Sequence, residues 1–359
     1  MTIRVATVQF EPRPADKAYN LARIEHFTNA AARDAVQLVA FPELCLVGNR
    51  HLTKLSEEEL SDIAEPEDGS SVTQIRALSE RLDIGIAVGL LAEREGRLFN
   101  AYAVCLPDGA VHIHRKLHTV GYHGISEGDG YTVFDTPWGV RLGVLICFDN
   151  NIVENVRATA LLGTQILLAP HQTGGTHTIV PFAENPLPLS VWENRATAPD
   201  TVRKAFAGPT GRDWLQLHLP TRAHDNGLFI VFSNGIGRDD DEVRTGNAMI
   251  VDPCGRIIAE SRAIDDHMVT ADLDLDLVSG SVGQWWTKAR RPELYQPLTT
   301  ARSSTSGTSS MPGTPRMPST SGTPGAPSMP RASGASGTKP PSRQSPPPPT
   351  PQAQAQQRS

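Results

Sequence analysis

Cysteine is scarce in this chain of 359 residues, and its four copies are far apart with no Cys-x-x-Cys pair among them. This spacing excludes a zinc framework and a disulfide scaffold, and it fits a protein of the reducing cytoplasm. The sequence also lacks an apolar run long enough to span a bilayer. Its first residues read as a strand that Arg4 interrupts, which differs from a secretory signal peptide. We therefore predict a soluble, cytoplasmic protein that makes no contact with a membrane.

Acidic residues are absent from residues 301–359, where Pro, Ser, Thr, Gly and Gln dominate. Such a segment cannot bury enough apolar surface to offset its ordering entropy, so we predict a disordered tail over residues 299–359. All 39 acidic residues and all but six of the 33 basic residues precede this tail, which gives the remainder a formal charge near −12. That charge disfavours nucleic acid as a partner.

Strand-like and helix-like patterns alternate along residues 1–298, which predicts one mixed α/β domain whose helices cover sheets. The expected helices are residues 17–34, 70–82, 152–162 and 214–225. The expected strands are residues 3–10, 36–41, 84–93, 98–106, 111–115, 140–147, 165–169, 228–233, 248–252, 256–260 and 267–273. Between residues 171 and 213 the prolines are too frequent for one continuous helix, and we interpret this stretch as a substrate lid or insertion.

Three side chains with reactive groups stand where an expected strand ends. Glu43 follows residues 36–41 and Pro42, Lys116 follows residues 111–115, and Cys147 closes residues 140–147. In α/β sheets, side chains at the carboxyl ends of strands meet in the crevice where ligands bind. Each residue alone has an ordinary structural explanation, because a single Cys is usually a small buried hydrophobe and a Lys is usually solvated. Their occurrence together predicts a site.

The chain resembles the nitrilase superfamily of carbon–nitrogen hydrolases in an ordered set of motifs over about residues 3–295. The motifs that carry the resemblance are Phe41-Pro42-Glu43, His114-Arg115-Lys116, Gly143-Val144-Leu145-Ile146-Cys147-Phe148-Asp149, Arg222-Ala223-His224-Asp225-Asn226, Ser233-Asn234 and Gly246-Asn247-Ala248-Met249. The resemblance implies a four-layer αββα sandwich and a homo-oligomer in which helices of two subunits extend the layers. It also implies that Glu43, Lys116 and Cys147 are the catalytic residues.

The chemistry of these residue types agrees with that implication. A cysteine is a strong nucleophile only as a thiolate, so it needs a neighbouring base, and Glu43 can take the proton and return it to a leaving amine. Lys116 can stabilise the thiolate and the oxyanion, and the backbone N–H of Phe148, at the start of the next helix, is the expected second oxyanion donor. This route through a thioester requires no metal or organic cofactor.

Further site residues follow from position. Many family members carry an additional acid between the Lys and the Cys, and Glu127 is the only Glu in that interval. His171 and Gln172 follow an expected strand and are candidates for substrate binding. The alternating His112 and His114 have no third partner for a metal, and we interpret them as a solvated strand face. Residues 239–242, Asp-Asp-Asp-Glu, are interpreted as a solvated acidic turn.

These features predict an enzyme that hydrolyses a small linear amide or N-carbamoyl compound and releases ammonia or amine. The pair Phe148-Asp149 resembles amidase-type members more than nitrilases, which more often have Trp-Glu there. A nitrilase acting on R–C≡N with the same three residues is the alternative. A third hypothesis is a catalytically silent scaffold whose tail recruits partners, and retention of all three reactive residues argues against it.

Overall fold

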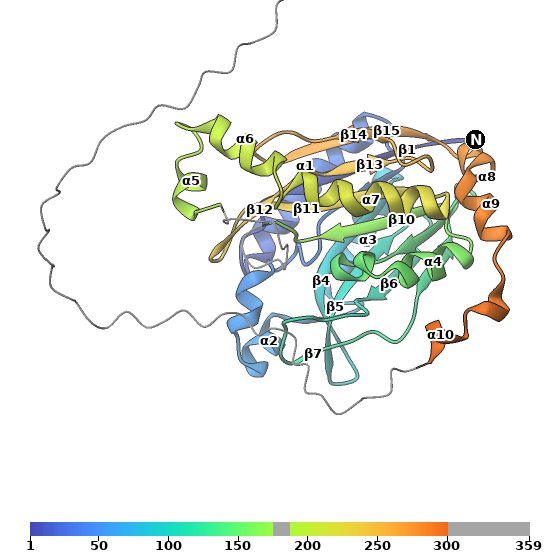
Figure 1. The fold of residues 1–359 in the computed structure, drawn as a ribbon. Coiled ribbons are helices and arrows are strands. Elements are labelled where there is room, and N and C mark those ends of the chain that lie inside the picture. The colour runs from blue at the N-terminus through green and yellow to red at the C-terminus, as the bar shows by residue number, and fades with distance from the viewer. Residues whose placement is uncertain (175–186, 301–359) are drawn as a thin grey trace, which may run out of the picture. The chain divides into compact units, whose positions relative to one another are not determined.

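The structure, a computed structural model, describes residues 1–174 and 187–300 (Figure 1). The expected tail beyond residue 300 and the middle of the expected lid lie outside the described residues. Its strands are β1 (Thr2–Phe10), β2 (Leu38–Ala40), β3 (Glu65–Pro66), β4 (Gly85–Arg94), β5 (Arg97–Cys105), β6 (Val111–Arg115), β7 (Ile125–Ser126), β8 (Thr132–Asp135), β9 (Arg141–Val144), β10 (Ile166–His171), β11 (Phe229–Asp239), β12 (Glu242–Thr245), β13 (Met249–Val251), β14 (Ile257–Glu260) and β15 (His267–Asp274).

The α-helices are α1 (Lys17–Arg33), α2 (Glu57–Ile63), α3 (Ser70–Leu82), α4 (Val153–Leu161), α5 (Leu189–Glu193), α6 (Pro199–Ala207), α7 (Arg212–Asn226), α8 (Asp276–Gly280), α9 (Val282–Lys288) and α10 (Gln296–Thr299). Three short 3-10 helices are η1 (Arg50–Lys54), η2 (Cys147–Asn151) and η3 (Pro292–Leu294). The long periodic elements match the sequence predictions closely. The short elements α2, α5, β8 and β12 were not predicted, because segments of this length carry too few residues for a clear period. Helix α6 was not predicted because it lies in the proline-rich stretch that we interpreted as an insertion.

The strands form one hydrogen-bonded sheet in the order β6-β5-β4-β2-β1-β11-β10-β9-β8. Alternate side chains of β1 face two different cores: Ile3 and Val5 belong to one, and Ala6, Val8 and Phe10 to the other. The same alternation on β10 and β11 produces a third core. A strand buried on both faces requires a covering layer on each side, which explains why the strands read as continuous apolar runs.

The three cores define four layers. One core lies between the sheet and helices α1 and α3, the second lies between the two halves of the folded sheet, and the third lies between the sheet and helices α4 and α7. Figure 1 shows α4 and α7 side by side on the face toward the viewer. The predicted four-layer αββα sandwich is therefore confirmed.

The central strands run in one direction, which places their carboxyl ends at one edge. Strands β2, β1, β11, β10 and β9 form parallel pairs, and β4 runs parallel to β2. Glu43 follows β2, Gln172 and Thr173 follow β10, and Cys147 begins η2 just after β9. Strand β6, two antiparallel steps from β4, brings Lys116 to the same edge.

Candidate active site

Glu43 and Lys116 form a buried ion pair at this edge. The Nζ atom of Lys116 lies 2.6 Å from Oε1 of Glu43, and both side chains are at most 5% exposed. The same carboxylate oxygen accepts a hydrogen bond of 2.6 Å from Nδ2 of Asn100, on β5. Burial is the largest single influence and opposes the charge on Lys116, but Glu43, Cys147 and Tyr122 together outweigh it and raise the pKa of the ammonium. Lys116 therefore stays positively charged beside Glu43.

The backbone that carries Glu43 depends on a close approach of β4. A β-carbon added at Gly89 would lie 2.2 Å from the backbone nitrogen of Leu44, closer than any real side chain can approach. The carbonyl of Phe41 accepts a hydrogen bond of 2.7 Å from the hydroxyl of Ser233. Only glycine permits this packing, so the sequence specifies the position of the carboxylate through residues that are far from it along the chain.

Cys147 stands at a sharp turn between β9 and α4. Its φ of 49° is in the left-handed region, which costs a residue with a β-carbon about 1–2 kcal/mol. The turn continues as η2, so Phe148 is among the first residues of a helical turn, whose N–H groups have no partner within the helix. The thiol is thereby presented at the end of the strand rather than packed within it.

Cys147, Glu43 and Lys116 share one cavity of about 530 Å³. The described residues that line it are Glu43, Asn49, Lys116, Val120, Tyr122, Cys147, Phe148, Asn151, Gln172, Thr173, Trp214, His218, Arg222, Glu242 and Arg244. A cavity of this size accommodates a small molecule and excludes a folded polypeptide. The structure thus brings the three predicted catalytic side chains together.

The surroundings of Cys147 favour the neutral thiol in the resting protein. Burial raises the pKa of Cys147 to about 11, and the Glu43 carboxylate raises it as well, whereas Lys116 and hydrogen bonds from Gln172 and Thr173 lower it. A thiol in this state needs a base that removes its proton as it attacks, and Glu43 is the carboxylate in place to do so.

The raised pKa of Cys147 predicts a steep pH dependence of its reactivity. Only the thiolate reacts, and the fraction of thiolate rises with pH. The rate at which iodoacetamide alkylates Cys147 should therefore rise roughly tenfold per pH unit from pH 7 to 10, without a plateau. The measurement is peptide-resolved mass spectrometry, with the exposed Cys254 as an internal standard for the reagent. A rate for Cys147 that is already maximal at pH 7 would show that the resting site holds a thiolate instead.

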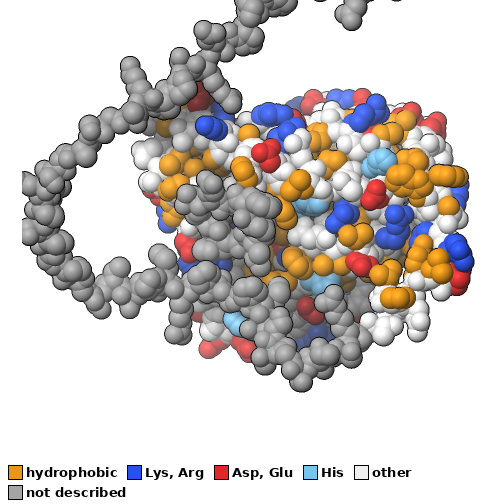
Figure 2. Space-filling view, viewed as in Figure 1, with side chains coloured by type: hydrophobic (Ala, Val, Ile, Leu, Met, Phe, Trp, Pro, Cys, Tyr) orange, Lys and Arg blue, Asp and Glu red, His pale blue; other side chains and the backbone are white. Residues whose placement is uncertain are grey.

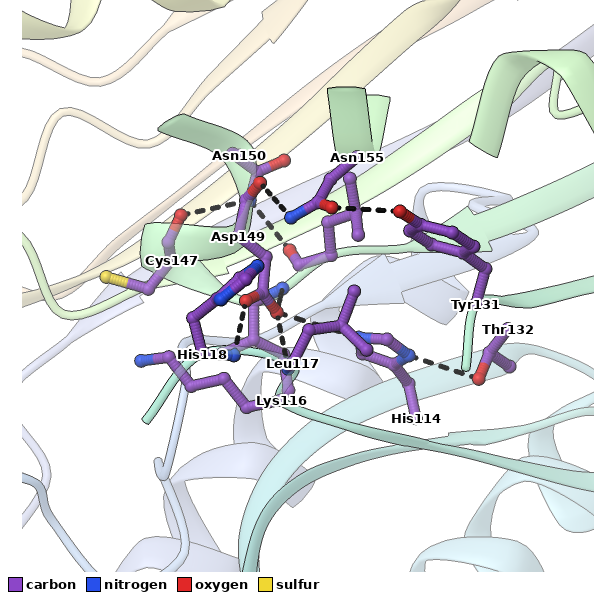
Figure 3. A network of polar contacts seen from close by, with 12 residues as sticks. His114, Lys116, Leu117, His118, Tyr131, Thr132, Cys147, Asp149, Asn150 and Asn155 are labelled. Atoms are coloured by element: carbon purple, nitrogen blue, oxygen red, sulfur yellow. Dashed lines mark hydrogen bonds and ion pairs between the residues drawn. The ribbon is translucent and has the colours of Figure 1, made fainter. Parts of the chain in front are cut away.

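Asp149 joins the segment of Cys147 to the segment of Lys116 (Figure 3). Its buried carboxylate accepts hydrogen bonds from the backbone N–H of Leu117 at 3.1 Å, of His118 at 3.0 Å and of Ile146 at 3.2 Å. The Nε2 atom of His114 lies 3.8 Å from the same carboxylate. A single side chain therefore holds the segment of Cys147 against residues that are 31 and 32 positions from Asp149 in the sequence.

Of the other predicted site residues, Gln172 lines the cavity, whereas His171 and Glu127 do not. Gln172 is buried, lines the cavity, and donates from Nε2 to the backbone carbonyl of Glu43 at 2.8 Å. His171 is also buried, but it lies behind Thr173 and does not belong to the cavity lining. Glu127 is exposed and lines a separate surface hollow with Arg97 and other residues. The structure therefore does not bring Glu127 to Cys147.

Several residues of the site were not predicted from the sequence. Asn100 contacts Glu43, and His218, Tyr122 and Arg244 line the cavity. Asn100 and Tyr122 had no recognisable signal, because each lies on or beside a strand with no motif of its own. His218 precedes the Arg222 motif by one helical turn on α7, and this spacing could have indicated it.

The acidic turn at residues 239–242 is only partly as predicted. Asp241 is exposed at 48% of its side chain, but the side chains of Asp239 and Glu242 are buried. Both form ion pairs of 2.8 Å with the buried Arg244. The prediction of a solvated turn was wrong for these two residues, because their partner is on the returning strand β12 and the pairing permits burial.

The predicted solvated face of β6 is also corrected. His114 is fully buried between Thr132 and Asp149, and His112 is half-buried and stacks on Phe134. Strand β8 covers these residues, and the sequence had not indicated that strand. Within residues 1–174 and 187–300, no group of three or more His, Cys, Asp or Glu side chains is placed to hold a metal ion. None of the helices in the described part of the chain is long and apolar enough to cross a bilayer.

Comparisons with known proteins agree with this geometry. A family model described as carbon-nitrogen hydrolase matches residues 4–281. The chain is 31% identical over 278 residues to an (R)-stereoselective amidase from Pseudomonas sp, a match that covers 76% of this chain and 86% of that protein. It is 25% identical over 316 residues to an N-carbamoylputrescine amidase from Solanum lycopersicum, with 83% and 95% of the two chains covered.

A solved structure has the same fold. It is a variant of the amidase from Nesterenkonia sp. AN1, and it matches with a TM-score of 0.61 at 22% identity, covering 82% of this chain and 99% of that chain. In that protein, the active-site cysteine carries the product of Michael addition of acrylamide. Together with the family model over residues 4–281, these matches show that the chain is an enzyme that belongs to the carbon–nitrogen hydrolase family, in the nitrilase superfamily.

Proposed function

We propose that this enzyme hydrolyses the C–N bond of a small linear amide or N-carbamoyl compound, with Cys147 as nucleophile, Glu43 as general base and acid, and Lys116 as the cation of the oxyanion site. The observation that carries the proposal is the buried Glu43–Lys116 ion pair that shares one cavity with Cys147. The names of the amidase relatives support the same class of substrate. The role of each residue follows from its position.

In the proposed reaction, Glu43 takes the thiol proton while the sulfur of Cys147 attacks the carbonyl carbon. The charge that develops on the carbonyl oxygen is stabilised by Lys116 and by the backbone N–H of Phe148. The C–N bond then breaks, and Glu43 returns the proton to the departing nitrogen, which leaves as ammonia or amine. Water, deprotonated by Glu43, attacks the thioester and releases the acid and the free thiol.

An unpaired acceptor in the cavity favours an amide over a nitrile. Nδ1 of His218 lies 3.1 Å from the backbone carbonyl of Trp214, so this nitrogen carries the hydrogen and Nε2 is the acceptor. Nε2 has no partner among the described residues, and the side chain is 7% exposed at the cavity wall. Burial lowers the pKa of His218 to about 4, so the ring remains a neutral acceptor at ordinary pH. An amide or carbamoyl N–H can satisfy Nε2, whereas a nitrile has no such donor.

The test of the proposed function is ammonia release from matched amide, N-carbamoyl and nitrile compounds with the same acyl group. Release from an amide or carbamoyl compound that is absent in the Cys147→Ala variant supports the proposal. Release from nitriles alone would establish a nitrilase instead. Release that persists in Cys147→Ala would show that another residue is the nucleophile.

His218 provides a test of substrate recognition. Replacing His218 with leucine removes one neutral hydrogen bond to the substrate, so kcat/KM for amides should fall about threefold to tenfold. The loss should appear mainly in KM, because this contact is made in the ground state as well as in the transition state. The measurement compares an amide with its N,N-dimethyl analogue, which lacks the donor. An equal loss for both compounds would contradict the assigned contact.

We also propose that residues 171–213 determine substrate choice as an insertion within a hydrolase domain of residues 1–298, with 299–359 as a separate tail. The support is the position of the stretch beside the cavity. The cavity is lined by Gln172 and Thr173, at one end of the stretch, and by Trp214, just beyond its other end. Between them, Trp192 of α5 stacks on Phe206 of α6, and both belong to a small core that the stretch shares with strands β11 and β12. Exchange of residues 187–213 with the corresponding stretch of a relative should change substrate preference and leave alkylation of Cys147 unchanged.

The homo-oligomer remains our proposal, and the apolar surface of three helices supports it. Figure 2 shows hydrophobic side chains gathered over the face that carries α4, α7 and α9. Leu217 is 69% exposed and Trp285 is 66% exposed on this face. Exposed aromatic and aliphatic clusters mark protein interfaces. Sedimentation equilibrium that gives the mass of one chain at micromolar concentration would contradict the proposal.

The reducing cytoplasm is likewise proposed as the compartment. All four cysteines are free, and two of them, Cys45 and Cys105, are buried. Free thiols persist in a reducing compartment, whereas disulfides form and persist in an oxidising one. Fractionation of cells that places the active enzyme in a secreted fraction would contradict this assignment.

A further inference from the structure

We propose that Asn150, His171 and Thr173 form a hydrogen-bond relay that directs the hydroxyl hydrogen of Thr173 onto the sulfur of Cys147. In this relay, Thr173 is a catalytic residue that stabilises the thiolate, and His171 is a positioning residue that fixes the direction of the Thr173 hydroxyl. The inference rests on the proposed role of Cys147 as the nucleophile.

The relay begins at Asn150, whose amide has a fixed orientation. Its Nδ2 atom lies 2.8 Å from the backbone carbonyl oxygen of Leu145 and 3.4 Å from that of Cys147. Carbonyl oxygens only accept hydrogen bonds, so the atom that faces them must be the amide nitrogen. The same nitrogen lies 3.2 Å from Nε2 of His171, and both side chains are buried.

The orientation of Asn150 determines the tautomer of His171. An Nε2 atom that faces an N–H₂ group must be the acceptor, so the single hydrogen of a neutral ring is on Nδ1. Burial lowers the pKa of His171 well below its ordinary value, and the positive charge of Lys116 lowers it further, which keeps the ring neutral. The ring is also held by contact with Phe232, at 4.8 Å between centroids.

The tautomer of His171 in turn determines what the Thr173 hydroxyl does. Nδ1 of His171 lies 3.3 Å from Oγ1 of Thr173, so Nδ1–H donates and Oγ1 accepts. The hydroxyl hydrogen is then directed elsewhere, and Sγ of Cys147 lies 3.8 Å from Oγ1. The backbone of Thr173 is fixed on both sides by Asn234, whose Oδ1 accepts from Thr173 N at 2.8 Å and whose Nδ2 donates to Thr173 O at 3.0 Å.

A hydrogen-bond donor at the sulfur of Cys147 would stabilise a thiolate that its other surroundings disfavour. Burial and the Glu43 carboxylate both disfavour the charged sulfur, and the cation that lowers its pKa most, Lys116, is already paired with Glu43. A hydrogen bond to a charged group stabilises it more than one to a neutral group. The hydrogen bonds of the relay can run in only one direction, from Asn150 through His171 to Thr173. The Thr173 hydroxyl is therefore oriented before the thiolate forms and needs no reorganisation during attack.

The experiment measures Cys147 alkylation by iodoacetamide against pH, resolved by peptide mass spectrometry, in the full-length enzyme. Thr173→Val should lower the rate at pH 8 by about tenfold to a hundredfold and move the rise of the profile to higher pH. Thr173→Ser, which keeps the hydroxyl, should recover most of that loss. His171→Leu should lower the rate less than Thr173→Val does, and His171→Asn, whose amide can donate from nearly the position of Nδ1, should recover part of it.

The double variant separates a relay from two independent contributions. If His171 acts only through Thr173, His171→Leu combined with Thr173→Val should be no slower than Thr173→Val alone. Additive losses would overturn the relay, as would a wild-type pH profile in Thr173→Val, and His171→Leu provides the same test if Thr173→Val does not fold. Thr73→Val, at an exposed position on α3, is the matched control for loss of a threonine hydroxyl. The alkylation assay needs no substrate, so silence of the amide panel with an intact relay would reject the proposed function alone.

Discussion

Replacing Lys116 with methionine should lower kcat/KM by roughly a thousandfold and lower the free energy of unfolding by about 3–5 kcal/mol. The loss of activity is expected because the substitution removes the cation that stabilises the oxyanion. The loss of stability has a separate cause: the Glu43 carboxylate remains buried, and Asn100 becomes its one remaining close partner among the described residues. Methionine has nearly the length of lysine, so the loss of packing volume contributes little.

Steady-state kinetics and urea unfolding of the same preparations measure the two effects. Lys54→Met is the matched control, because Lys54 pairs with Asp240 at the surface and its side chain is 51% exposed. Exposed ion pairs contribute about 0–1 kcal/mol, so the control should be nearly as stable as the wild type. If Lys116→Met unfolds like the control and keeps its activity, the buried ion pair has neither the structural nor the catalytic role assigned to it.

Replacing Asp149 with asparagine should lower kcat/KM at least about a hundredfold and lower the free energy of unfolding by about 2–4 kcal/mol. The carboxylate of Asp149 accepts from the backbone N–H groups of Leu117, His118 and Ile146. An asparagine amide turns an N–H₂ group toward at least one of these donors, which leaves buried donors without an acceptor. The segment after Lys116 and the turn that carries Cys147 then lose the hydrogen bonds that connect them.

The two variants should differ in how alkylation of Cys147 responds. Lys116→Met removes a charge that lowers the pKa of Cys147, so its alkylation profile should move to higher pH. Asp149→Asn should mainly allow the turn at Cys147 to adopt more conformations. The rate of Cys147 alkylation should therefore change at every pH, while its pH profile should move little along the pH axis. The matched control is Asp135→Asn, an exposed carboxylate whose partner is Arg141. Wild-type kinetics in Asp149→Asn would contradict the anchoring role.

The sequence was informative where a residue type coincided with the end of a strand. Glu43, Lys116 and Cys147 could be predicted as neighbours because parallel strands converge at one edge, and the structure places all three in one cavity. The four-layer fold followed from the resemblance, whereas the residue patterns alone predicted only a mixed α/β domain whose helices cover sheets. Strand boundaries such as β6 (Val111–Arg115) were predicted to the residue, because the turns that bound them have clear signals.

Pairings between distant residues could not be predicted in this way. Nothing near Asp239 in sequence indicates whether it is solvated, because its burial depends on Arg244 across a hairpin. His171 and Thr173 could both be assigned to the crevice from their position after the expected strand at residues 165–169, but only the structure shows that Thr173 lines the cavity and His171 lies behind it. Glu127 was chosen because it is the only Glu in its interval, and a count of residue types does not determine where a loop places one of them.

The left-handed backbone of Cys147 has a consequence for how this enzyme can be improved. At a φ of 49°, glycine has no steric penalty, so Cys147→Gly relieves a cost that every residue with a β-carbon bears. A mutant library screened for heat resistance alone should therefore enrich an inert protein at this position. Protein engineers who want a durable catalyst from this chain need a screen that scores turnover and heat resistance together, because at residue 147 the two selections favour different amino acids.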